Sequence, residues 1–198
     1  MGRPPKFEER SEEIMHAFEA CVARQGLAAT TLADVAAEAA LPRSLVRYFM
    51  GNRDDMVDRL IERLMVRSEA SLSRVRDEKG AADLDGLIDL YAGEVFGNEL
   101  TNTVMGELWY VAKYDQHVRE RLHGVYDYAI DLLVGAMARN RAGRSSAERQ
   151  GAAYAILALA LGDTSLRDFG IAPKRKGTLR AAMQQVVDRL DERKGVGR

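Results

Sequence analysis

Residues 30–53 decide the fold, and they read TTLADVAAEAALPRSLVRYFMGNR. The two threonines at the start can cap a helix, because a threonine hydroxyl accepts a hydrogen bond from a backbone N–H that has no partner inside the helix. A short helix follows and ends near residues 39–40, and its inward residues are Leu32, Val35 and Ala36. Pro42 then predicts a second helix over 42–50, because proline suits the first turn of a helix and disrupts its interior.

The second short helix has the side chains of a helix that contacts DNA. Its polar residues are Arg43, Ser44, Arg47 and Tyr48. Arginine can donate two hydrogen bonds to guanine O6 and N7, and hydroxyl groups can meet phosphates or base edges. The apolar residues Leu41, Val46 and Met50 are placed to hold the helix against its neighbours. Two short helices in this order predict a helix-turn-helix motif over about residues 31–50.

Positive charge is concentrated on this second helix. Residues 41–53 hold three arginines and no acidic residue, whereas residues 1–56 hold seven Lys and Arg against nine Asp and Glu, a net charge of −2. The whole chain carries a net charge of −1, which argues against a non-specific nucleic-acid coat. The charge pattern favours a small DNA-contacting surface, although the spacing alone also fits an ordinary helical hairpin with solvated arginines.

The first 60 residues resemble the DNA-binding domain of TetR-family (tetracycline-repressor-like) transcriptional regulators. The resemblance runs in order and without gaps over about residues 8–60. It rests on residues 14–18 (IMHAF) with Gly26, 29–36 (ATTLADVA), 40–44 (ALPRS) and 52–56 (NRDDM). It implies an all-α fold with an N-terminal three-helix DNA-binding domain, residues 1–55, and a C-terminal helical domain, residues 56–198, that binds an effector and forms a homodimer. It also implies a repressor that a small molecule releases from a palindromic operator.

The resemblance further implies which residues contact double-stranded operator DNA. They are Thr31 at a phosphate, Pro42, Arg43, Ser44 and Leu45 at the base-contacting start of the third helix, and Arg53 near the DNA backbone. Arg47 and Tyr48 complete the set, and Arg3 and Lys6 lie in a basic stretch that is either a groove-contacting arm or a disordered tail.

Three positions depart from the family pattern. Arg47 stands where the family usually has tyrosine, and Met50 stands where it usually has phenylalanine. A register shifted by one residue would match Tyr48 and Phe49 instead, at the cost of a gap. Ala40 stands where the family usually has glycine, so we expect a turn that is less strained or differently shaped.

The rest of the chain also has helical periodicity, and strand signals are nearly absent. The predicted helices span residues 7–24, 53–78, 83–97, 101–113, 115–140, 147–161 and 178–193. The helix over 147–161 is apolar on nearly all sides, so it must be covered on two sides. We therefore expect a second subunit to pack on it and on the last helix.

The resemblance implies an effector site among the C-terminal helices. Candidates for its lining are Phe96, Met105, Glu107, Trp109, Tyr110 and Tyr126. The aromatic side chains can form a wall, and the carboxylate of Glu107 can pair with a cationic ligand. The alternative for each of these residues is a place in the core at helical spacing.

Composition limits the remaining classes of protein. The single cysteine, Cys21, cannot form an internal disulfide, and the chain has neither an apolar run of about 18 residues nor an N-terminal signal segment. A cytoplasmic protein is the expectation. The sequence lacks a Gly-x-Ser-x-Gly elbow, a His-Glu-x-x-His motif and a glycine-rich phosphate loop, so we expect neither an enzyme nor a cofactor.

Two rival functions stay open at this point. Glu13 with His16, and Glu120 with His123, form two Glu-x-x-His motifs, which a di-iron oxidoreductase bundle would use as inward-facing ligands. His16 lies off the apolar face of its predicted helix, so we expect it to face solvent and not a metal. The other rival is a helical adaptor that binds only protein.

Overall fold

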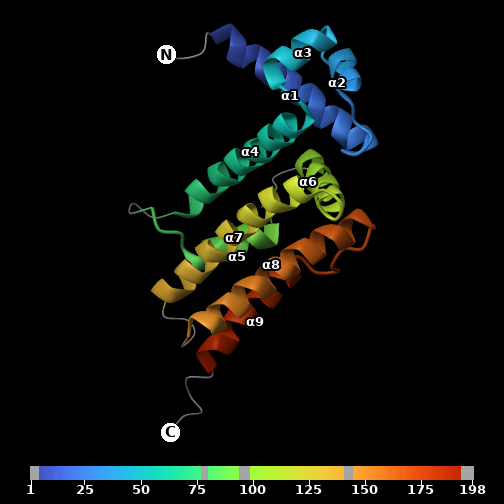
Figure 1. The fold of residues 1–198 in the computed structure, drawn as a ribbon. Coiled ribbons are helices and arrows are strands. Elements are labelled where there is room, and N and C mark those ends of the chain that lie inside the picture. The colour runs from blue at the N-terminus through green and yellow to red at the C-terminus, as the bar shows by residue number, and fades with distance from the viewer. Residues whose placement is uncertain (1–4, 77–79, 94–98, 141–144, 193–198) are drawn as a thin grey trace. The chain divides into compact units, whose positions relative to one another are not determined.

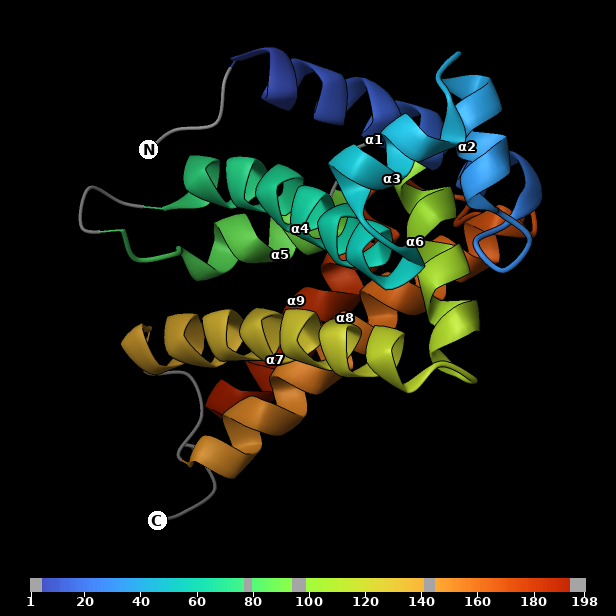
Figure 2. The same cartoon turned by 45° about the horizontal axis from the view of Figure 1, so that its top comes forward.

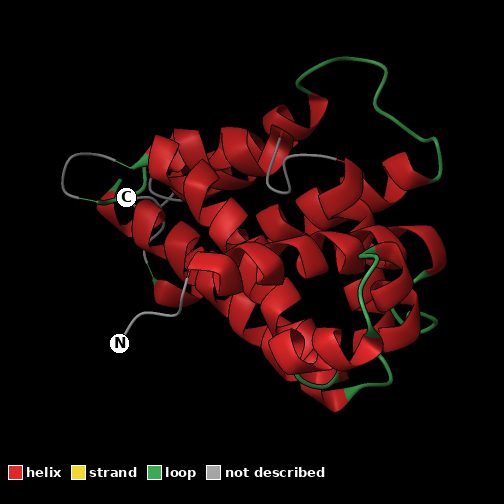
Figure 3. Cartoon of the chain, turned by 90° about the horizontal axis from the view of Figure 1, so that it is seen from above, coloured by secondary structure: helices red, strands yellow, loops and turns green. Residues whose placement is uncertain are grey.

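The computed structural model describes residues 5–76, 80–93, 99–140 and 145–192, and these form helices joined by loops (Figure 1, Figure 3). The α-helices are α1 (Pro5–Gln25), α2 (Leu32–Glu38), α3 (Arg43–Met50), α4 (Arg53–Leu72), α5 (Leu84–Gly93), α6 (Glu99–Ala112), α7 (Gln116–Arg139), α8 (Ser146–Asp168) and α9 (Thr178–Glu192), with a 3-10 turn η1 (Ser73–Val75) after α4. Within the described ranges, the β-type pairing is one isolated bridge between Arg76 and Ala82. The all-α fold class is confirmed.

Two predicted helix ends are wrong. The helix expected over 53–78 ends at Leu72 and tightens into η1. The helix expected over 147–161 continues to residue 168, because Thr164 and Ser165 donate hydrogen bonds back to carbonyls one turn earlier and do not interrupt it. Gly170, with a φ of 75°, ends that helix instead.

One compact unit, called the N-terminal unit below, contains Met1–Val66 and Asn98–Gly124. In it α1 packs against α2, α3 and α6, and α2 packs against α3 (Figure 2). The inward face of α1 is almost completely buried, and its members are Ile14, Phe18, Cys21 and Val22. Burial raises the pKa of the Cys21 thiol, so this cysteine is poorly reactive.

The second compact unit, called the C-terminal unit, contains Arg67–Gly97 and Val125–Arg198. In it α5, α8 and α9 pack against one another (Figure 1). Its core includes Leu87, Ile88, Leu133, Met137, Ile156 and Met183. A capping box fixes the start of α8, because the side chains of Ser145 and Glu148 each accept a hydrogen bond from the backbone N–H of the other residue. In the part of the chain that is described, no helix is both long and apolar enough to cross a membrane.

Candidate nucleic-acid interface

The start of α2 is fixed by Thr31. Its hydroxyl accepts a hydrogen bond from the backbone N–H of Asp34 at 3.3 Å, and the Asp34 carboxylate accepts one from the Thr31 N–H at 2.8 Å. These two residues form a capping box, so the predicted cap is confirmed. The hydrogen bonds that Thr31 donates lower the pKa of Asp34. Contact between Thr31 and a phosphate stays a prediction.

The turn between α2 and α3 is strained, contrary to the expectation for Ala40. Ala40 has a φ of 52°, in the left-handed region that favours glycine. The Ala40 N–H donates to the Ala37 carbonyl at 3.2 Å, and the Leu41 N–H donates to the Ala36 carbonyl at 2.9 Å. This is the hydrogen-bond pattern of a Schellman motif, which needs a left-handed residue just beyond the helix. The motif therefore forms with alanine, at the cost of a Cβ in an unfavourable conformation.

One side of α3 is anchored in the core. Val46 and Met50 are completely buried, as expected, while Leu41 is half-buried. Pro42 serves as the N-cap of α3, with its carbonyl accepting from the Leu45 N–H at 2.9 Å. Gly51, with a φ of 84°, ends the helix where a Cβ would collide with the Asp55 carboxylate. Because both ends and the inner side are fixed, the outer side of α3 has a defined orientation within the N-terminal unit.

The outer side of α3 carries the predicted DNA contacts. Arg43, Ser44, Arg47 and Tyr48 are all exposed, together with Pro42, and Leu45 is half-buried. The structure thus brings these side chains to the surface of one eight-residue helix that has no acidic residue. Two guanidinium groups and two hydroxyl groups on one exposed face can donate to base edges and phosphates.

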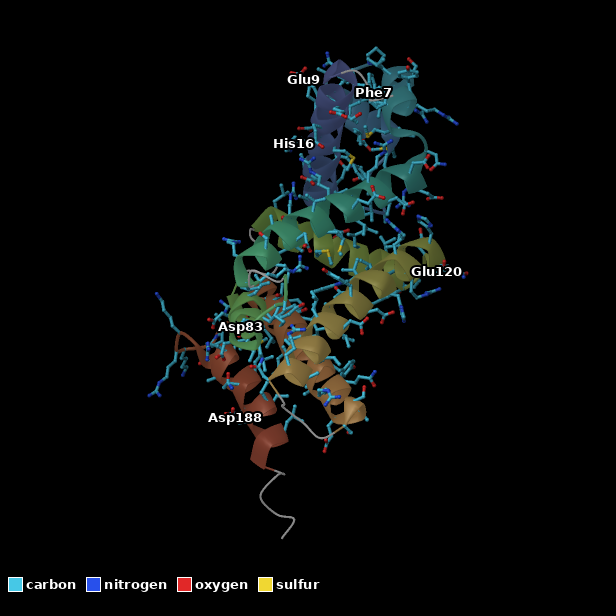
Figure 4. The ribbon with its side chains drawn as sticks, turned by 90° about the vertical axis from the view of Figure 1, so that its left-hand side faces the viewer. Phe7, Glu9, His16, Asp83, Glu120 and Asp188 are labelled. Carbon is cyan, nitrogen blue, oxygen red and sulfur yellow. The ribbon has the colours of Figure 1, made fainter. Side chains whose placement is uncertain are left out.

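An aromatic cluster of Phe7, Tyr48 and Phe49 joins the start of α1 to the end of α3. The Phe7 ring centroid lies 4.8 Å from that of Phe49 and 6.4 Å from that of Tyr48. Tyr48 is nevertheless 73% exposed, so ring packing orients it without burying it. Figure 4 shows Phe7 at the start of α1. The role of Phe7 was not predicted, although its place seven residues before Ile14, on the same face of the helix, is a signal for packing.

The proposed N-terminal arm cannot be placed in the same way. Arg3 lies outside the described residues, as does the side chain of Lys6. Their contact with a DNA groove stays a prediction.

Arg53 is engaged within the protein. It is the first residue of α4, and its Nη2 donates to the Leu27 carbonyl at 3.2 Å. Its Nη1 lies 3.8 Å from Asp115 Oδ2. The side chain is 39% exposed. These partners were not visible in the sequence, because Leu27 and Asp115 lie 26 and 62 positions away along the chain.

The effector candidates are found in different environments. Met105 is buried, Trp109 and Tyr126 are half-buried, and Tyr110 is exposed beside Tyr114 at a centroid distance of 5.9 Å. Glu107 Oε2 accepts a hydrogen bond from the Leu27 N–H at 2.9 Å. Tyr126 belongs to the C-terminal unit and the other four to the N-terminal unit, while Phe96 lies outside the described residues. Their contact with an effector stays a prediction.

Charged side chains connect α4 to α1 and to the first part of α7, within the N-terminal unit. Arg63 Nε lies 2.8 Å from Glu19 Oε1 of α1, and that carboxylate is almost fully buried. On α7, Arg121 Nε lies 2.9 Å and His117 Nε2 lies 3.0 Å from the same oxygen of Asp58. A displacement of α4 would therefore strain charged contacts with both α1 and α7.

The di-iron alternative loses its structural basis. Its four candidate ligands, Glu13, His16, Glu120 and His123, are all exposed. Figure 4 shows His16 and Glu120 at the surface of α1 and α7, and the expected exposure of His16 is confirmed. Such a site needs its ligands inside a helical bundle. Among the described residues, no group of three or more His, Cys, Asp or Glu side chains is arranged to hold a metal ion.

Comparison with known proteins assigns the fold. The chain matches no protein-family model and no curated protein sequence. It is similar in structure to a TetR transcription regulator from Haloarcula marismortui, with a TM-score of 0.75 and 18% identity over 92% of this chain and 98% of that one. It is also similar to GusR from Salmonella enterica, with a TM-score of 0.72 and 16% identity over 91% and 96% of the two chains. A third similar structure is that of the multidrug binding protein EbrR in complex with imidazole, with a TM-score of 0.63 and 20% identity over 90% of this chain and 94% of that one.

These likenesses, all below 25% identity, show that the chain has the fold of a TetR transcription regulator. The family resemblance in the first 60 residues is thereby confirmed at the level of the fold.

Proposed function

We propose that this protein is a sequence-specific DNA-binding transcriptional regulator that contacts its operator through the outer side of α3. The observation that carries this proposal is the exposure of Arg43, Ser44, Arg47 and Tyr48 on a helix whose inner residues, Val46 and Met50, are completely buried. A rigid helix with a cationic outer face fits the major groove, where arginine discriminates guanine. The cytoplasmic location expected from the sequence suits such a role.

The regulator acts as a homodimer in this proposal. The C-terminal unit supports it with large apolar side chains that a single chain leaves in water: Tyr154 and Leu166 on α8, and Phe169 and Ile171 after it. Tyr154 and Phe169 are 69% and 79% exposed. Burial of such side chains by a second copy is favourable. Two copies would present two α3 helices to half-sites about one helical turn, roughly 34 Å, apart.

An effector would control the spacing of the two α3 helices. We infer a functional boundary near residue 55, with the helices after it binding a small molecule and repression as the default activity. The binding of a small molecule is supported by the similarity of the fold to that of EbrR, a multidrug binding protein in complex with imidazole. The effector must prefer one arrangement of α4 over another, because a ligand shifts an equilibrium only through differential affinity.

The proposal is tested by selection from a random duplex pool with the full-length protein. We expect an enriched near-palindrome bound in the nanomolar range, with affinity that falls steeply as salt rises. If no duplex sequence is enriched, and the protein binds DNA no more tightly than an unrelated acidic helical protein does, DNA recognition is contradicted and the helical adaptor is favoured. Stoichiometric iron in the purified protein would revive the metal alternative.

A further inference from the structure

The turn at Gly26 and Leu27 joins α1 to the helix-turn-helix motif. Both the N–H and the carbonyl of Leu27 form hydrogen bonds with side chains from other helices. The Leu27 N–H donates to Glu107 Oε2 of α6 at 2.9 Å. The Leu27 carbonyl accepts from Arg53 Nη2, at the start of α4, at 3.2 Å. We call Glu107, Leu27 and Arg53 the Leu27 clamp. Arg53 lies 26 positions and Glu107 lies 80 positions from Leu27 along the chain.

The approach of Glu107 depends on a glycine. Gly26 has a φ of 85°, and a Cβ on it would lie 2.8 Å from Glu107 Oε2. A side chain at position 26 would therefore both strain the backbone and push the carboxylate away. The glycine does more than end α1, because it makes room for the side chain that holds the next residue.

The held turn determines where α2 begins. Thr30 donates two hydrogen bonds to the Gly26 carbonyl, from its N–H at 3.2 Å and from its hydroxyl at 2.7 Å. Thr30 is buried, and the next residue is the N-cap Thr31. Leu27 itself is completely buried, so loss of a partner for its N–H or carbonyl would leave a costly polar group. A shift of the turn would therefore be passed to α2 and then to α3.

Arg53 has a second partner that fixes its direction. Asp115 lies 3.8 Å from Arg53 Nη1 and also accepts the Val118 N–H at 3.2 Å, near the start of α7. The guanidinium is thus directed toward a buried turn on one side and a carboxylate on the other. A phosphate would therefore have to compete with both of these partners for the Arg53 guanidinium.

We propose that Arg53 and Glu107 are positioning residues that set the orientation of α2 and α3, and that neither is a contact for DNA or effector. The inference rests on the proposed DNA-binding function for its consequence, but the clamp itself is measurable without DNA. It assigns to Arg53 and Glu107 roles that differ from the phosphate contact and the effector contact that the sequence predicts.

The first test uses salt titrations on the duplex selected by the wild-type protein, with Arg53→Ala, Glu107→Ala, their double variant and Glu107→Gln. Each alanine variant is expected to weaken binding on the order of tenfold, the loss of one hydrogen bond to a charged group. The slope of log affinity against log salt is expected to stay at the wild-type value. The double variant should lose less than the product of the single losses, because both side chains act on one residue.

Glu107→Gln is the matched control, because its amide oxygen can still accept the Leu27 N–H. It should keep wild-type affinity within about twofold. A slope that falls by about one in Arg53→Ala would make Arg53 a phosphate contact and overturn the inference for that residue. A Glu107→Gln variant as weak as Glu107→Ala would overturn it for Glu107.

The second test measures amide hydrogen exchange in the DNA-free protein. Glu107→Ala should speed exchange at Leu27 and in α2 on the order of tenfold, whereas Glu38→Ala, which removes an exposed carboxylate paired with Arg24, should not affect Leu27. If exchange at Leu27 and in α2 is unchanged in Glu107→Ala, the Leu27 clamp is contradicted, independently of any result with DNA. Faster exchange, in a protein that selects no duplex, would retain the clamp and remove the proposed function.

Discussion

The outer side of α3 and the outer side of α8 are both exposed, but they expose opposite chemistry. α3 presents Arg43, Ser44 and Arg47. α8 presents Tyr154 and Leu166. A cationic face is stable in water and gains from a polyanionic partner, whereas an apolar face is costly in water and gains from an apolar partner. The difference supports the proposal of two kinds of partner for one chain, DNA at α3 and a second copy at α8.

The two helices also differ in what fixes them. α3 has eight residues and depends on Val46, Met50 and the turns at its ends. α8 has 23 residues and one side in the core of the C-terminal unit. A short helix derives little stability from its own hydrogen bonds. Changes beneath α3 should therefore affect stability most, and changes on its outer face should affect binding alone.

Met50→Ala is expected to have the largest effect. Met50 is completely buried, and its truncation leaves a cavity that costs about 2–4 kcal/mol of unfolding free energy. Chemical denaturation measures this loss. Arg47→Ala, on the exposed face, should stay within about 0.5 kcal/mol of the wild type. Equal losses of unfolding free energy in the two variants would contradict the difference between a buried inner side and an exposed outer side of α3.

Arg43→Ala should have the next largest effect, and it should weaken DNA binding without changing the stability of the protein. If Arg43 donates to a guanine, affinity for the selected duplex falls by about 1–3 kcal/mol and the preference at one base pair relaxes. Titrations against the selected duplex and its single-base variants measure both. An equal loss on every duplex would reassign Arg43 to a phosphate.

The double variant Tyr154→Ser, Phe169→Ser sharpens the other half of the comparison. Loss of two apolar side chains from an interface should weaken the dimer at least about tenfold. Sedimentation equilibrium measures the dissociation constant, and the unfolding free energy of the monomer is the control. A dimer of wild-type strength would show that α8 and the residues after it are covered by something other than a second copy.

The capping box predicts a smaller effect with a pH dependence. Thr31→Ala should cost about 1 kcal/mol, and Thr31→Ser, which keeps the hydroxyl, should cost much less. The pKa of Asp34 is lowered in the folded state, so its contribution is present above its ordinary pKa of about 4 and is lost as pH falls through the lowered value. Denaturation of wild type and Asp34→Asn at pH 7 and pH 3 tests this, since the difference should shrink in acid. A constant difference would contradict the assignment.

Ala40→Gly should have the smallest effect and the opposite sign. Glycine removes the Cβ from the left-handed position, which should stabilise the protein by about 0.5–1 kcal/mol despite the greater freedom of its unfolded state. Denaturant unfolding measures the gain, with Ala39→Gly as the control, because Ala39 has an ordinary φ of −78° and should be destabilised. A loss in Ala40→Gly would show that the left-handed turn carries little strain.

Local signals predicted much of the fold. The Thr31 cap and Pro42 predicted where the second and third helices begin, because turn and cap chemistry acts over a few residues. The structure adds Gly26 and Gly51, which have positive φ where α1 and α3 end. A Schellman motif ends both α2 and α8, and its left-handed residue is Ala40 in α2 and Gly170 in α8. Glycine is a usual signal and alanine is not, so the strain at Ala40 was missed.

The candidate site was predicted where it depends on helical spacing and missed where it depends on distant contacts. The exposure of Arg43, Ser44 and Arg47 follows from the burial of Val46 and Met50 on the same helix. The hydrogen bonds of Leu27 join residues far apart in the chain, and no periodicity encodes them.

The most direct test attaches a thiol-reactive photo-crosslinker to Ser44→Cys or to Tyr154→Cys and irradiates each protein with the selected duplex. The native Cys21 is completely buried and should not be labelled. The account predicts a protein–DNA adduct from position 44 and a covalent protein dimer from position 154. Adducts in the reverse pattern, or no DNA adduct from position 44 under conditions where the wild type binds, would contradict the assignment of DNA to α3 and of a second copy to α8.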